Sequence, residues 1–508
     1  MRNTKALYGE EGRAALKRGI DQVFNAVAPT LGAKGRNAVY KRYGAPVVTN
    51  DGVSIAREIL PEDPYERMGA EMIKQAGEST NDEAGDGTTS TTVFAHAMIE
   101  EGKKEVLNGE NPMVIKTSLE NELEKVVIVL KDISVPVTDI LNVARISVED
   151  EKIATLVSDV ITRVGPRGSI IVEEGHGNDT EVENVKGYWY DRGYVSPYMV
   201  TNEKGEAILQ ECPVLVTDRY MNLNKDLVGV LQEMLKMGKT MLLVIADNVE
   251  GELLQTLIAN KIQGRFTVIA VRRPSSIEEL EDIATVTGAV AVTKDKGIEE
   301  ITVEHLGMAK NVIVKKDKTI IVGHDSEEVT ARIAEVEELI SQQTEPYGVM
   351  ETLKVRLARL SDGLAVIRVG ARTDAERGYI KLKIDDAIGA CRAALEEGIV
   401  AGGGTTARNL SDVPDMGTPG GRILKYALMQ PYLQILKNAG MITESASIDT
   451  SKDYNVLTGE VIENMIDAGI VDPAKVVRVA IENAVSMAKT FLTTEVIIGD
   501  LPEEKPVK

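Results

Sequence analysis

A run of small and acidic residues at positions 81–91 has the composition of a site that binds phosphate and a metal ion. It reads Asn-Asp-Glu-Ala-Gly-Asp-Gly-Thr-Thr-Ser-Thr, so one carboxylate, Asp86, stands between two glycines and ahead of a run of hydroxyl residues. Glycine lets backbone approach a bulky anion. A helix starting here would offer N–H groups to phosphate, and the carboxylate could hold Mg²⁺. The other interpretation is an ordinary turn with Thr or Ser capping the next helix.

Two more glycine-containing loops could approach phosphate. The first runs over residues 30–37 (Thr-Leu-Gly-Ala-Lys-Gly-Arg-Asn) and carries two basic side chains. The second, at 398–406, contains three consecutive glycines but fits no P-loop spacing. A further aspartate beside glycine, Asp51, lies in Asn-Asp-Gly, a strong turn signal. The first loop is also compatible with a helix C-cap followed by a turn, and Asp51 is also compatible with an ordinary turn residue.

Hydrophobic periodicity indicates which elements must position these loops. It predicts helices at 12–28, 65–81, 88–109 and from 112 to about 132, so the first segment is helix-rich. From 187 to about 363, apolar strands such as 241–245 and 267–271 alternate with helices. This favours a layered α/β domain with a buried sheet. The flanking segments, 137–186 and 364–397, are mixed, and 405–495 is mostly helical.

The order helical, mixed, α/β, mixed, helical predicts nested domains. The α/β domain would be inserted into a small linking domain, which is itself inserted into the helical one. The chain would then cross each boundary twice, at Pro136 and Gly398 and at Gly187 and Gly363. Gly or Pro at paired crossings is typical of hinges, because few residues absorb the backbone change.

Two predicted helices of the α/β domain, 225–237 and 250–260, carry more apolar residues than one buried stripe needs. The first contains Leu227, Val228, Val230, Leu231 and Leu235, and the second contains Leu253, Leu254, Leu257 and Ile258. Part of each set could be exposed and bind a partner. Periodicity alone is equally compatible with a set that is entirely core.

Composition excludes several function classes. The net charge of −21 argues against a nucleic-acid partner, which needs basic patches. No apolar run is long enough to span a bilayer, and no apolar run follows Met1–Lys5, so neither a membrane segment nor a signal peptide is predicted. The two cysteines, Cys212 and Cys391, favour a reducing, cytoplasmic compartment. The four scattered histidines are predicted to be ordinary surface or core residues.

Several motifs occur together in an order that resembles a known family. They are Thr-Leu-Gly-Ala-Lys-Gly-Arg-Asn at 30–37, Asp-Gly-Val-Ser at 51–54, Ala-Gly-Asp-Gly-Thr-Thr at 84–89, Asp-Arg-Gly-Tyr-Val-Ser-Pro-Tyr at 191–198, Glu-Glu-Gly-Ile-Val-Ala-Gly-Gly-Gly at 396–404, and Asn-Met-Ile-Asp with Asp-Pro at 464–473. Over about residues 8 to 501 the chain resembles the chaperonins, most closely the bacterial group I (GroEL-like) type.

The resemblance implies the chaperonin fold, a multidomain α+β and α/β architecture nested by insertion. It implies a helical equatorial ATP-binding domain at 1–132 and 397–508 and a small mixed intermediate hinge domain at 133–186 and 364–396. A layered α/β apical domain at 187–363 would bind client protein. Subunits would form a homo-oligomeric ring, as a double ring, around a cavity.

The resemblance also implies an ATPase site. Asp386 would position the attacking water, Asp51 would be a second carboxylate of the hydrolytic site, and Asp86 would hold Mg²⁺. The implied phosphate-binding residues are Thr30, Leu31, Gly32, Gly87, Thr88, Thr89 and Ser90, and the implied nucleoside pocket contains Gly403, Asn455, Val456 and Asp472. ATP and Mg²⁺ are the implied cofactors, with K⁺ as a further candidate. Attack of water on a γ-phosphate needs orientation and charge neutralisation more than a covalent nucleophile.

In the apical domain the resemblance assigns client binding to eight residues: Tyr194, Val195, Tyr198, Met199, Val228, Leu231, Leu254 and Ile258. The implied partners are unfolded or misfolded proteins. A detachable co-chaperonin lid is also implied, because the span from Asp218 to Gly238 leaves no room for a built-in protrusion.

Three departures from the group I pattern concern the nucleotide site. Asn50 replaces the usual lysine near the phosphates, and group II relatives share the Thr-Asn-Asp-Gly text found here. Ala33 replaces the usual proline. A residue inserted between Asn455 and Asp472 leaves the assignment of Val456 and Leu457 to the pocket open.

The sequence leaves two alternatives to an ATP-driven folding chamber. A small-molecule phosphotransferase would need a second pocket with a general base, and no His, Cys or Lys constellation supplies one. A ring scaffold with an altered or impaired ATP cycle is the closer alternative. The presence of Asp51, Asp86 and Asp386 argues against it.

Overall fold

The computed structural model describes residues 4–42, 45–148, 150–165, 169–175, 177–184, 187–202, 205–298, 300–323, 326–341, 352–353, 355–357, 359–360, 364–443 and 448–500. The chain divides into two compact units. The first contains residues 1–159, 176–179 and 369–508, and the second contains 160–175 and 180–368. The first unit is therefore made of sequence from both ends of the chain.

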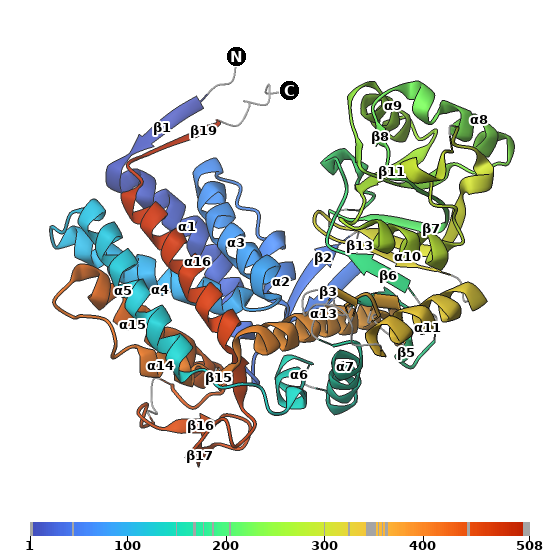
Figure 1. Cartoon of the computed structure of the whole chain (residues 1–508). Helices are drawn as coiled ribbons and strands as arrows, with labels where there is room; N and C mark the ends of the chain where they lie inside the picture. The colour runs from blue at the N-terminus through green and yellow to red at the C-terminus, as the bar shows by residue number, and fades with distance from the viewer. Residues whose placement is uncertain are drawn as a thin grey trace. The chain divides into compact units, whose positions relative to one another are not determined.

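The first unit is built on long helices that lie side by side (Figure 1). They are α1 (Gly9–Val27), α3 (Pro64–Ala84), α4 (Thr88–Leu107), α5 (Pro112–Ile133), α15 (Pro419–Asn438) and α16 (Ala474–Thr493). Each buries an apolar stripe at helical spacing; in α1 the stripe includes Leu16, Ile20, Val23 and Val27. Helix α16 packs on α3, α4 and α5, so a helix from the end of the chain completes the core that the first helices begin.

Further helices and strand pairs accompany these helices. The helices are α2 (Gly52–Glu58), α6 (Ile140–Val148), α7 (Glu151–Val164), α13 (Asp374–Glu397) and α14 (Thr405–Leu410), with a 3₁₀ turn at Ala28–Thr30. The antiparallel strand pairs are β1 (Thr4–Tyr8) with β19 (Val496–Asp500), β2 (Ala38–Arg42) with β3 (Ala45–Thr49), β15 (Ile399–Ala401) with β18 (Val471–Pro473), and β16 (Asp453–Asn455) with β17 (Glu460–Ile462).

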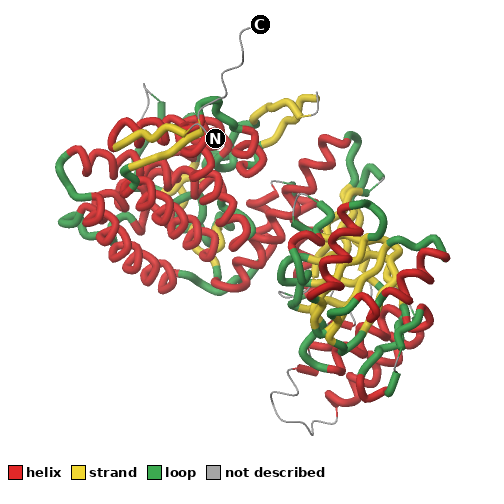
Figure 2. The backbone as a smooth tube through the Cα atoms, turned by 90° about the horizontal axis from the view of Figure 1, so that it is seen from above, coloured by secondary structure: helices red, strands yellow, loops and turns green. Residues whose placement is uncertain are grey.

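The second unit is a layered α/β structure, and Figure 2 shows its strands running between helices. Its sheet has the strand order β11-β9-β7-β12-β13-β6. These strands are β6 (Gly187–Tyr190), β7 (Ala207–Val216), β9 (Met241–Ala246), β11 (Thr267–Arg272), β12 (Gly307–Val314) and β13 (Thr319–Val322). Strands β7, β9 and β11 are parallel, whereas β12, β13 and β6 join antiparallel.

Helices α8 (Val228–Lys236), α9 (Gly251–Ile262), α10 (Ile277–Thr287) and α11 (Glu327–Ser341) accompany this sheet. Strands β8 (Tyr220–Met221) and β10 (Asn248–Val249) form a short parallel pair. A separate sheet has the order β4-β14-β5, with β4 (Ser169–Glu174), β5 (Glu181–Asn184) and β14 (Leu364–Val369). Strand β9 is apolar throughout and buried after Met241, as expected for a parallel strand covered on both faces.

Most predicted elements occur within a few residues of their predicted bounds, but two helices were not predicted in full. Asn-Asp-Gly was interpreted as a turn, whereas Asp51 caps α2 by accepting hydrogen bonds from Val53 N and Ser54 N. Helix α13 was predicted only from 385, although it begins at Asp374. Polar residues dominate its first turns, so apolar periodicity does not reveal them.

The three-domain division stays a prediction. The predicted equatorial segments, 1–132 and 397–508, lie within the first unit, and the predicted apical segment, 187–363, lies within the second. The boundary residues 186 and 363 and the C-terminal residues 501–508 lie outside the described ranges. Among the helices that are described, none is both long and apolar enough to cross a bilayer.

Candidate functional site

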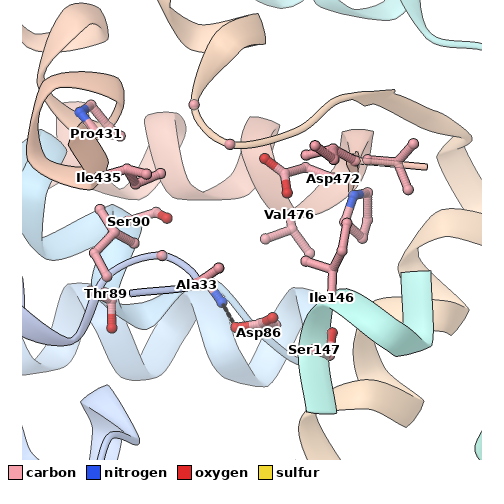
Figure 3. Close-up of a pocket in the computed structure, with 18 of the residues that line it drawn as sticks. Ala33, Asp86, Thr89, Ser90, Ile146, Ser147, Pro431, Ile435, Asp472 and Val476 are labelled. Atoms are coloured by element: carbon pink, nitrogen blue, oxygen red, sulfur yellow. Dashed lines mark hydrogen bonds between the residues drawn. The ribbon is translucent and has the colours of Figure 1, made fainter. Parts of the chain in front are cut away.

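One cavity of the first unit, of about 770 Å³, brings together the residues that the sequence assigned to nucleotide chemistry. Figure 3 shows Asp86, Thr89 and Ser90 at this cavity, with Asp472, Ile146 and Ile435 around it. All the predicted catalytic, metal and nucleotide residues line it: Thr30, Leu31, Gly32, Asp51, Asp86, Gly87, Thr88, Thr89, Ser90, Asp386, Gly403, Asn455, Val456 and Asp472. They come from seven separate stretches of sequence.

Backbone geometry explains the two glycines beside Asp86. Gly85 ends α3 in the left-handed region, at φ 75°, and Gly87 stands just before α4 at φ 101°. Residues with a Cβ rarely adopt these angles, so the sharp turn from α3 into α4 requires glycine. The turn directs the first N–H groups of the 20-residue helix α4 towards the cavity.

Some hydroxyl groups of this region form hydrogen bonds within the protein, and others line the cavity. The Thr88 hydroxyl donates to the carbonyl of Gly77 at 3.2 Å, and the Thr30 hydroxyl donates to the carbonyl of Val27 at 2.8 Å. Both side chains are buried, so a ligand would contact the backbone of Thr30 and Thr88 rather than their hydroxyl groups. Thr89 and Ser90 are only partly buried and line the cavity (Figure 3).

Acidic side chains dominate the end of the cavity near α13. Burial raises the pKa of Asp86, against the N–H of Gly87 and the charge of Lys383, which lower it. Burial also raises the pKa of Asp386 well above its ordinary value, and the neighbouring charges of Asp86 and Asp51 raise it further. Carboxylates that repel one another in a desolvated site would be stabilised by a bound cation.

Helix α13 lies against the Asp86 turn through a contact between two glycines. A Cβ on Gly389 would stand 2.6 Å from the Cα of Gly85, and a Cβ on Gly85 would be closer still to the backbone of Gly389. Real Cβ atoms do not approach backbone so closely. The absence of both side chains therefore allows α13 to bring Asp386 to the cavity.

The other end of the cavity is apolar and closed by Asp472. Met465, Ile470, Val476, Tyr432 and Ile435 provide its walls. Burial raises the pKa of Asp472 to about 7; the charge of Asp86 contributes to this rise, and the N–H of Gly404 partly offsets it. An apolar enclosure with one polar group is typical of a site that binds a flat aromatic ring.

The hairpin β16–β17 supplies Asn455 and Val456, and a polar network fixes it beside the cavity. Arg408 forms an ion pair with Asp453 at 2.8 Å, and the Thr405 hydroxyl donates to the same carboxylate at 3.0 Å. The guanidinium of Arg408 also stacks on Tyr432, at 4.8 Å from the ring centroid. Leu457, whose assignment the sequence left open, lines the cavity together with Val456.

Several lining residues were not predicted. They are Val143, Arg145, Ile146 and Ser147 from α6, Lys383 from α13, and the apolar wall residues of α15 and α16. None stands in a glycine-rich motif, and apolar side chains at helical spacing look the same whether they face a core or a ligand. Lys383 could have been noticed, since it precedes Asp386 by three residues on one helix.

The predicted client-binding residues lie in the second unit, and their side chains differ in exposure. Tyr198 is 70% exposed and Val228 is 37% exposed, whereas Tyr194, Val195, Leu231, Leu254 and Ile258 are partly buried. We call these seven residues the α8–α9 surface. Met199 does not belong to it, because its side chain is 1% exposed and its sulfur accepts a hydrogen bond from Ala270 N.

The apolar residues of α8 and α9 were predicted to be either entirely core or partly exposed for binding, and the structure contains both kinds. Leu227, Val230, Leu253 and Leu257 are buried in the core of the second unit. Val228 and Leu235 are exposed on the same helix, so the apolar set is divided between core and surface.

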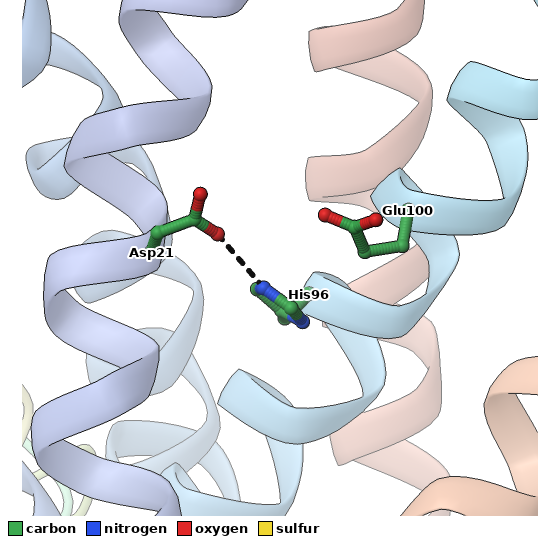
Figure 4. A group of neighbouring side chains, drawn as sticks. All are labelled: Asp21, His96 and Glu100. Carbon is green, nitrogen blue, oxygen red and sulfur yellow. Dashed lines mark hydrogen bonds and ion pairs between the residues drawn. The ribbon is translucent and has the colours of Figure 1, made fainter.

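Figure 4 shows a second group of polar side chains, Asp21, His96 and Glu100, with the geometry of a possible metal site. The ammonium of Lys17 forms ion pairs with both carboxylates and lies 3.3 Å from Nε2 of His96. The imidazole stacks on Phe24 with 3.7 Å between centroids. Lys17 supplies the positive charge that a metal would bring, so the group is a partly buried ion-pair network. His176 and His324 lie outside the described residues.

Comparisons with known proteins agree with this architecture. Residues 23–502 match the model of the TCP-1/cpn60 chaperonin family. Two crystal structures of the chaperonin gp146 from bacteriophage EL 2 (Pseudomonas aeruginosa), determined in the presence of ATP-BeFx, have a similar fold. Crystal form II is 21% identical with a TM-score of 0.68, and form I is 22% identical with a TM-score of 0.64; each match covers 98% of this chain and 99% of gp146. The chain belongs to the TCP-1/cpn60 chaperonin family.

Proposed function

We propose that this protein is an ATP-dependent chaperone that captures non-native proteins on the α8–α9 surface and promotes their folding within a ring of subunits. Family membership supports the chaperone role. The observation that carries the ATP-dependent part is the single cavity that gathers every residue predicted for nucleotide chemistry. The three-domain division predicted from sequence is part of this proposal, with 133–186 and 364–396 as the hinge.

The cavity has the chemistry of a triphosphate site at one end and a base site at the other. The N-terminus of α4 and the glycine at position 32 offer backbone to phosphate. A Cβ on Gly32 would reach the Ile435 side chain at 3.0 Å, so this loop is already as close to the opposite wall as glycine permits. The apolar end, with Asp472, would hold the nucleoside.

The acidic end fits Mg²⁺, because carboxylate oxygens are its preferred protein ligands. Asp86 would hold the ion, which when bound would offset the negative charge of the phosphates. Asp386 would accept a hydrogen bond from water and direct its oxygen at the γ-phosphorus. A new P–O bond then forms as the bond from the γ-phosphorus to the β–γ bridging oxygen breaks, a proton of the water passes to Asp386, and ADP and phosphate are released. Asp51 contributes negative charge beside this water and fixes the start of α2.

The α8–α9 surface fits an unfolded chain, which exposes apolar side chains without a fixed shape. Four of its residues, Val228, Leu231, Leu254 and Ile258, stand on α8 and α9, and buried residues of the same helices anchor them in the core of the second unit. A separate co-chaperonin lid would bind the same surface in turn. The assembly would be a homo-oligomeric double ring of the group I type.

Electron microscopy of the purified protein with and without ATP tests this proposal, together with ATP turnover and recovery of a denatured reporter enzyme. We expect rings that change shape with ATP and raise the yield of refolded reporter. Rings with neither turnover nor a shape change would favour the scaffold alternative. A monomer that does not bind ATP would overturn the proposal.

A further inference from the structure

A second cavity lies in the α/β unit, and charged side chains make up much of its lining. Its volume is about 410 Å³, and it is lined by residues 191–195 together with Arg272, Lys316 and Asp317. Three of the lining residues are cations and two are acids, although the chain as a whole carries a net charge of −21. An excess of positive charge in a hollow of an acidic protein suits an anionic ligand.

Three separate segments form this cavity, and one glycine allows two of them to meet. After β6 the chain passes the turn between β12 and β13, where Tyr194 N donates to the carbonyl of Lys315 at 3.2 Å. It then reaches β11, where Val195 N donates to the carbonyl of Ala270 at 3.0 Å. A Cβ on Gly193 would stand 2.1 Å from the carbonyl oxygen of Lys315, so the segment can lie this close to the turn only without a side chain. These backbone contacts hold the three segments together around the cavity.

The cations of this cavity are open to a ligand. The side chains of Arg192, Arg272 and Lys316 are exposed, and within the described parts of the chain none of them forms a hydrogen bond or an ion pair. The two acids of the cavity do not cancel this charge, since three positive and two negative groups leave a formal charge of +1. One of the acids, Asp191, also lies 3.9 Å from Arg359, which offsets part of its negative charge.

The cavity adjoins the surface that is proposed to bind client. Tyr194 and Val195 line the cavity and also belong to the α8–α9 surface. Tyr198, a few residues further along the same segment, is 70% exposed. An unfolded chain that binds these apolar side chains would therefore bring its neighbouring residues to the cavity. The anionic groups of such a chain are the carboxylates of Asp, Glu and the C-terminus.

We infer that this cavity binds a carboxylate of the client chain, beside the apolar side chains that the α8–α9 surface holds. The inference rests on the proposed client-binding function. Guanidinium groups suit this role because they bind both oxygens of a carboxylate in one plane. A singly charged carboxylate fits better than a phosphate group, because the two acids of the cavity would repel a second negative charge. The protein would then prefer apolar segments that carry a carboxylate nearby over segments that are apolar alone.

Binding of fluorescent peptides to the full-length protein without nucleotide tests this inference. Four peptides share one apolar segment; they carry either Glu or Gln on both flanks, and their C-terminus is either free or amidated. We expect the parent protein to bind the amidated Glu peptide about fivefold more tightly than the amidated Gln peptide. Because the protein as a whole is acidic, its general field disfavours the Glu peptide, so this preference would report a local site. A preference that appears only for the free C-terminus would assign the site to chain ends.

Substitutions in the cavity should change this preference in opposite directions. Arg272→Gln combined with Lys316→Gln should abolish it, while the affinity for the amidated Gln peptide stays the same. Asp317→Asn removes a negative charge from the cavity and should therefore increase the preference for carboxylate. The matched control is Lys310→Gln, which removes an exposed cation of β12 that does not line the cavity, and it should match the parent protein.

Two results would overturn the inference and leave the client surface in place. One is equal affinity of the parent protein for all four peptides. The other is a preference for carboxylate that survives the double substitution, because the carboxylate would then bind elsewhere. If none of the peptides binds, the proposed client surface itself is wrong, because the apolar segment is common to all four.

Discussion

The nucleotide cavity and the α8–α9 surface are built in different ways. The cavity depends on backbone: glycines at 32, 85, 87 and 389 bring loops and helices close, and a few carboxylates stand among them. The α8–α9 surface depends on side chains of common apolar types that stand next to core residues of the same kinds. A glycine-dependent site tolerates few substitutions, whereas an apolar surface can exchange one aliphatic side chain for another.

This difference predicts that the two regions can be damaged separately. The largest effect is expected from Asp386→Ala. Loss of the carboxylate that positions water should lower hydrolysis about a hundredfold or more, with ATP binding largely intact. Rapid-quench turnover and equilibrium nucleotide binding measure the two quantities. Capture of denatured protein without nucleotide should be unchanged. Normal turnover in this variant would show that Asp386 does not position the attacking water.

The converse damage is predicted for the double change Val228→Ser and Leu231→Ser. Each substitution removes apolar area from the surface offered to client, so affinity for a denatured protein should fall about tenfold or more. ATP hydrolysis without client should match the parent protein. The control is Gln232→Ser, a polar position that follows Leu231 on α8. Unchanged client affinity in the double variant would move the binding surface elsewhere.

The glycine contact provides a smaller but sharper test. Gly389→Ala adds a Cβ against the backbone of Gly85 and should push α13 away from the Asp86 turn. Hydrolysis should fall about tenfold, because small displacements of a positioning group are costly. ATP affinity should change less, since the loops and α4 are untouched.

The matched control lies on the same helix. A Cβ on Gly378 would meet nothing within 4 Å, so Gly378→Ala should raise helix stability slightly and leave turnover alone. Equal effects of the two alanine variants on turnover would show that helix propensity, rather than the contact with Gly85, is what matters at position 389.

The smallest predicted effect concerns pH and Asp472. Its folded-state pKa of about 7 lies above the ordinary value of 3.8, so the unfolded chain releases this proton first as pH rises. Ionisation of the buried carboxylate therefore lowers stability progressively up to about pH 7. Asp472→Asn cannot ionise. The melting temperatures of Asp472→Asn and of the parent protein are measured without nucleotide. Between about pH 5.5 and 8, the parent protein should lose a few degrees relative to the variant. A constant difference would mean that this end of the cavity is hydrated.

The comparison also shows which parts of the molecule the sequence reveals. A phosphate and metal site was predicted around Asp86 because glycine lets backbone approach an anion and a carboxylate can hold Mg²⁺, with an ordinary turn as the alternative. The cavity contains all the residues assigned to nucleotide chemistry. Ile146, Ser147 and the apolar walls were not predicted, because only tertiary packing shows which face of a helix meets the cavity.

In the second unit, prediction is limited because the same apolar residue types occur in the core and on the surface. Periodicity could not distinguish Val228, which is exposed, from Val230, which is buried two residues later. Met199 illustrates the limit of reasoning from resemblance, since it shares a motif with exposed Tyr198 but points into the core. The assignment to group I, the lid and the number of rings stay predictions.

The pairing of β1 with β19 has a consequence for biosynthesis. Thr4 is paired with Asp500, and Tyr8 with Val496, so this strand pair cannot form until nearly the whole sequence has left the ribosome. Helix α16 packs on α3, α4 and α5, so the core of the first unit also cannot be completed until the end of the chain has been synthesised. The second unit has all its residues by position 368 and can fold during synthesis. A nascent chain would then hold its folded α/β unit while its early helices wait for their partners, so this chaperone would itself need protection from aggregation before it is complete.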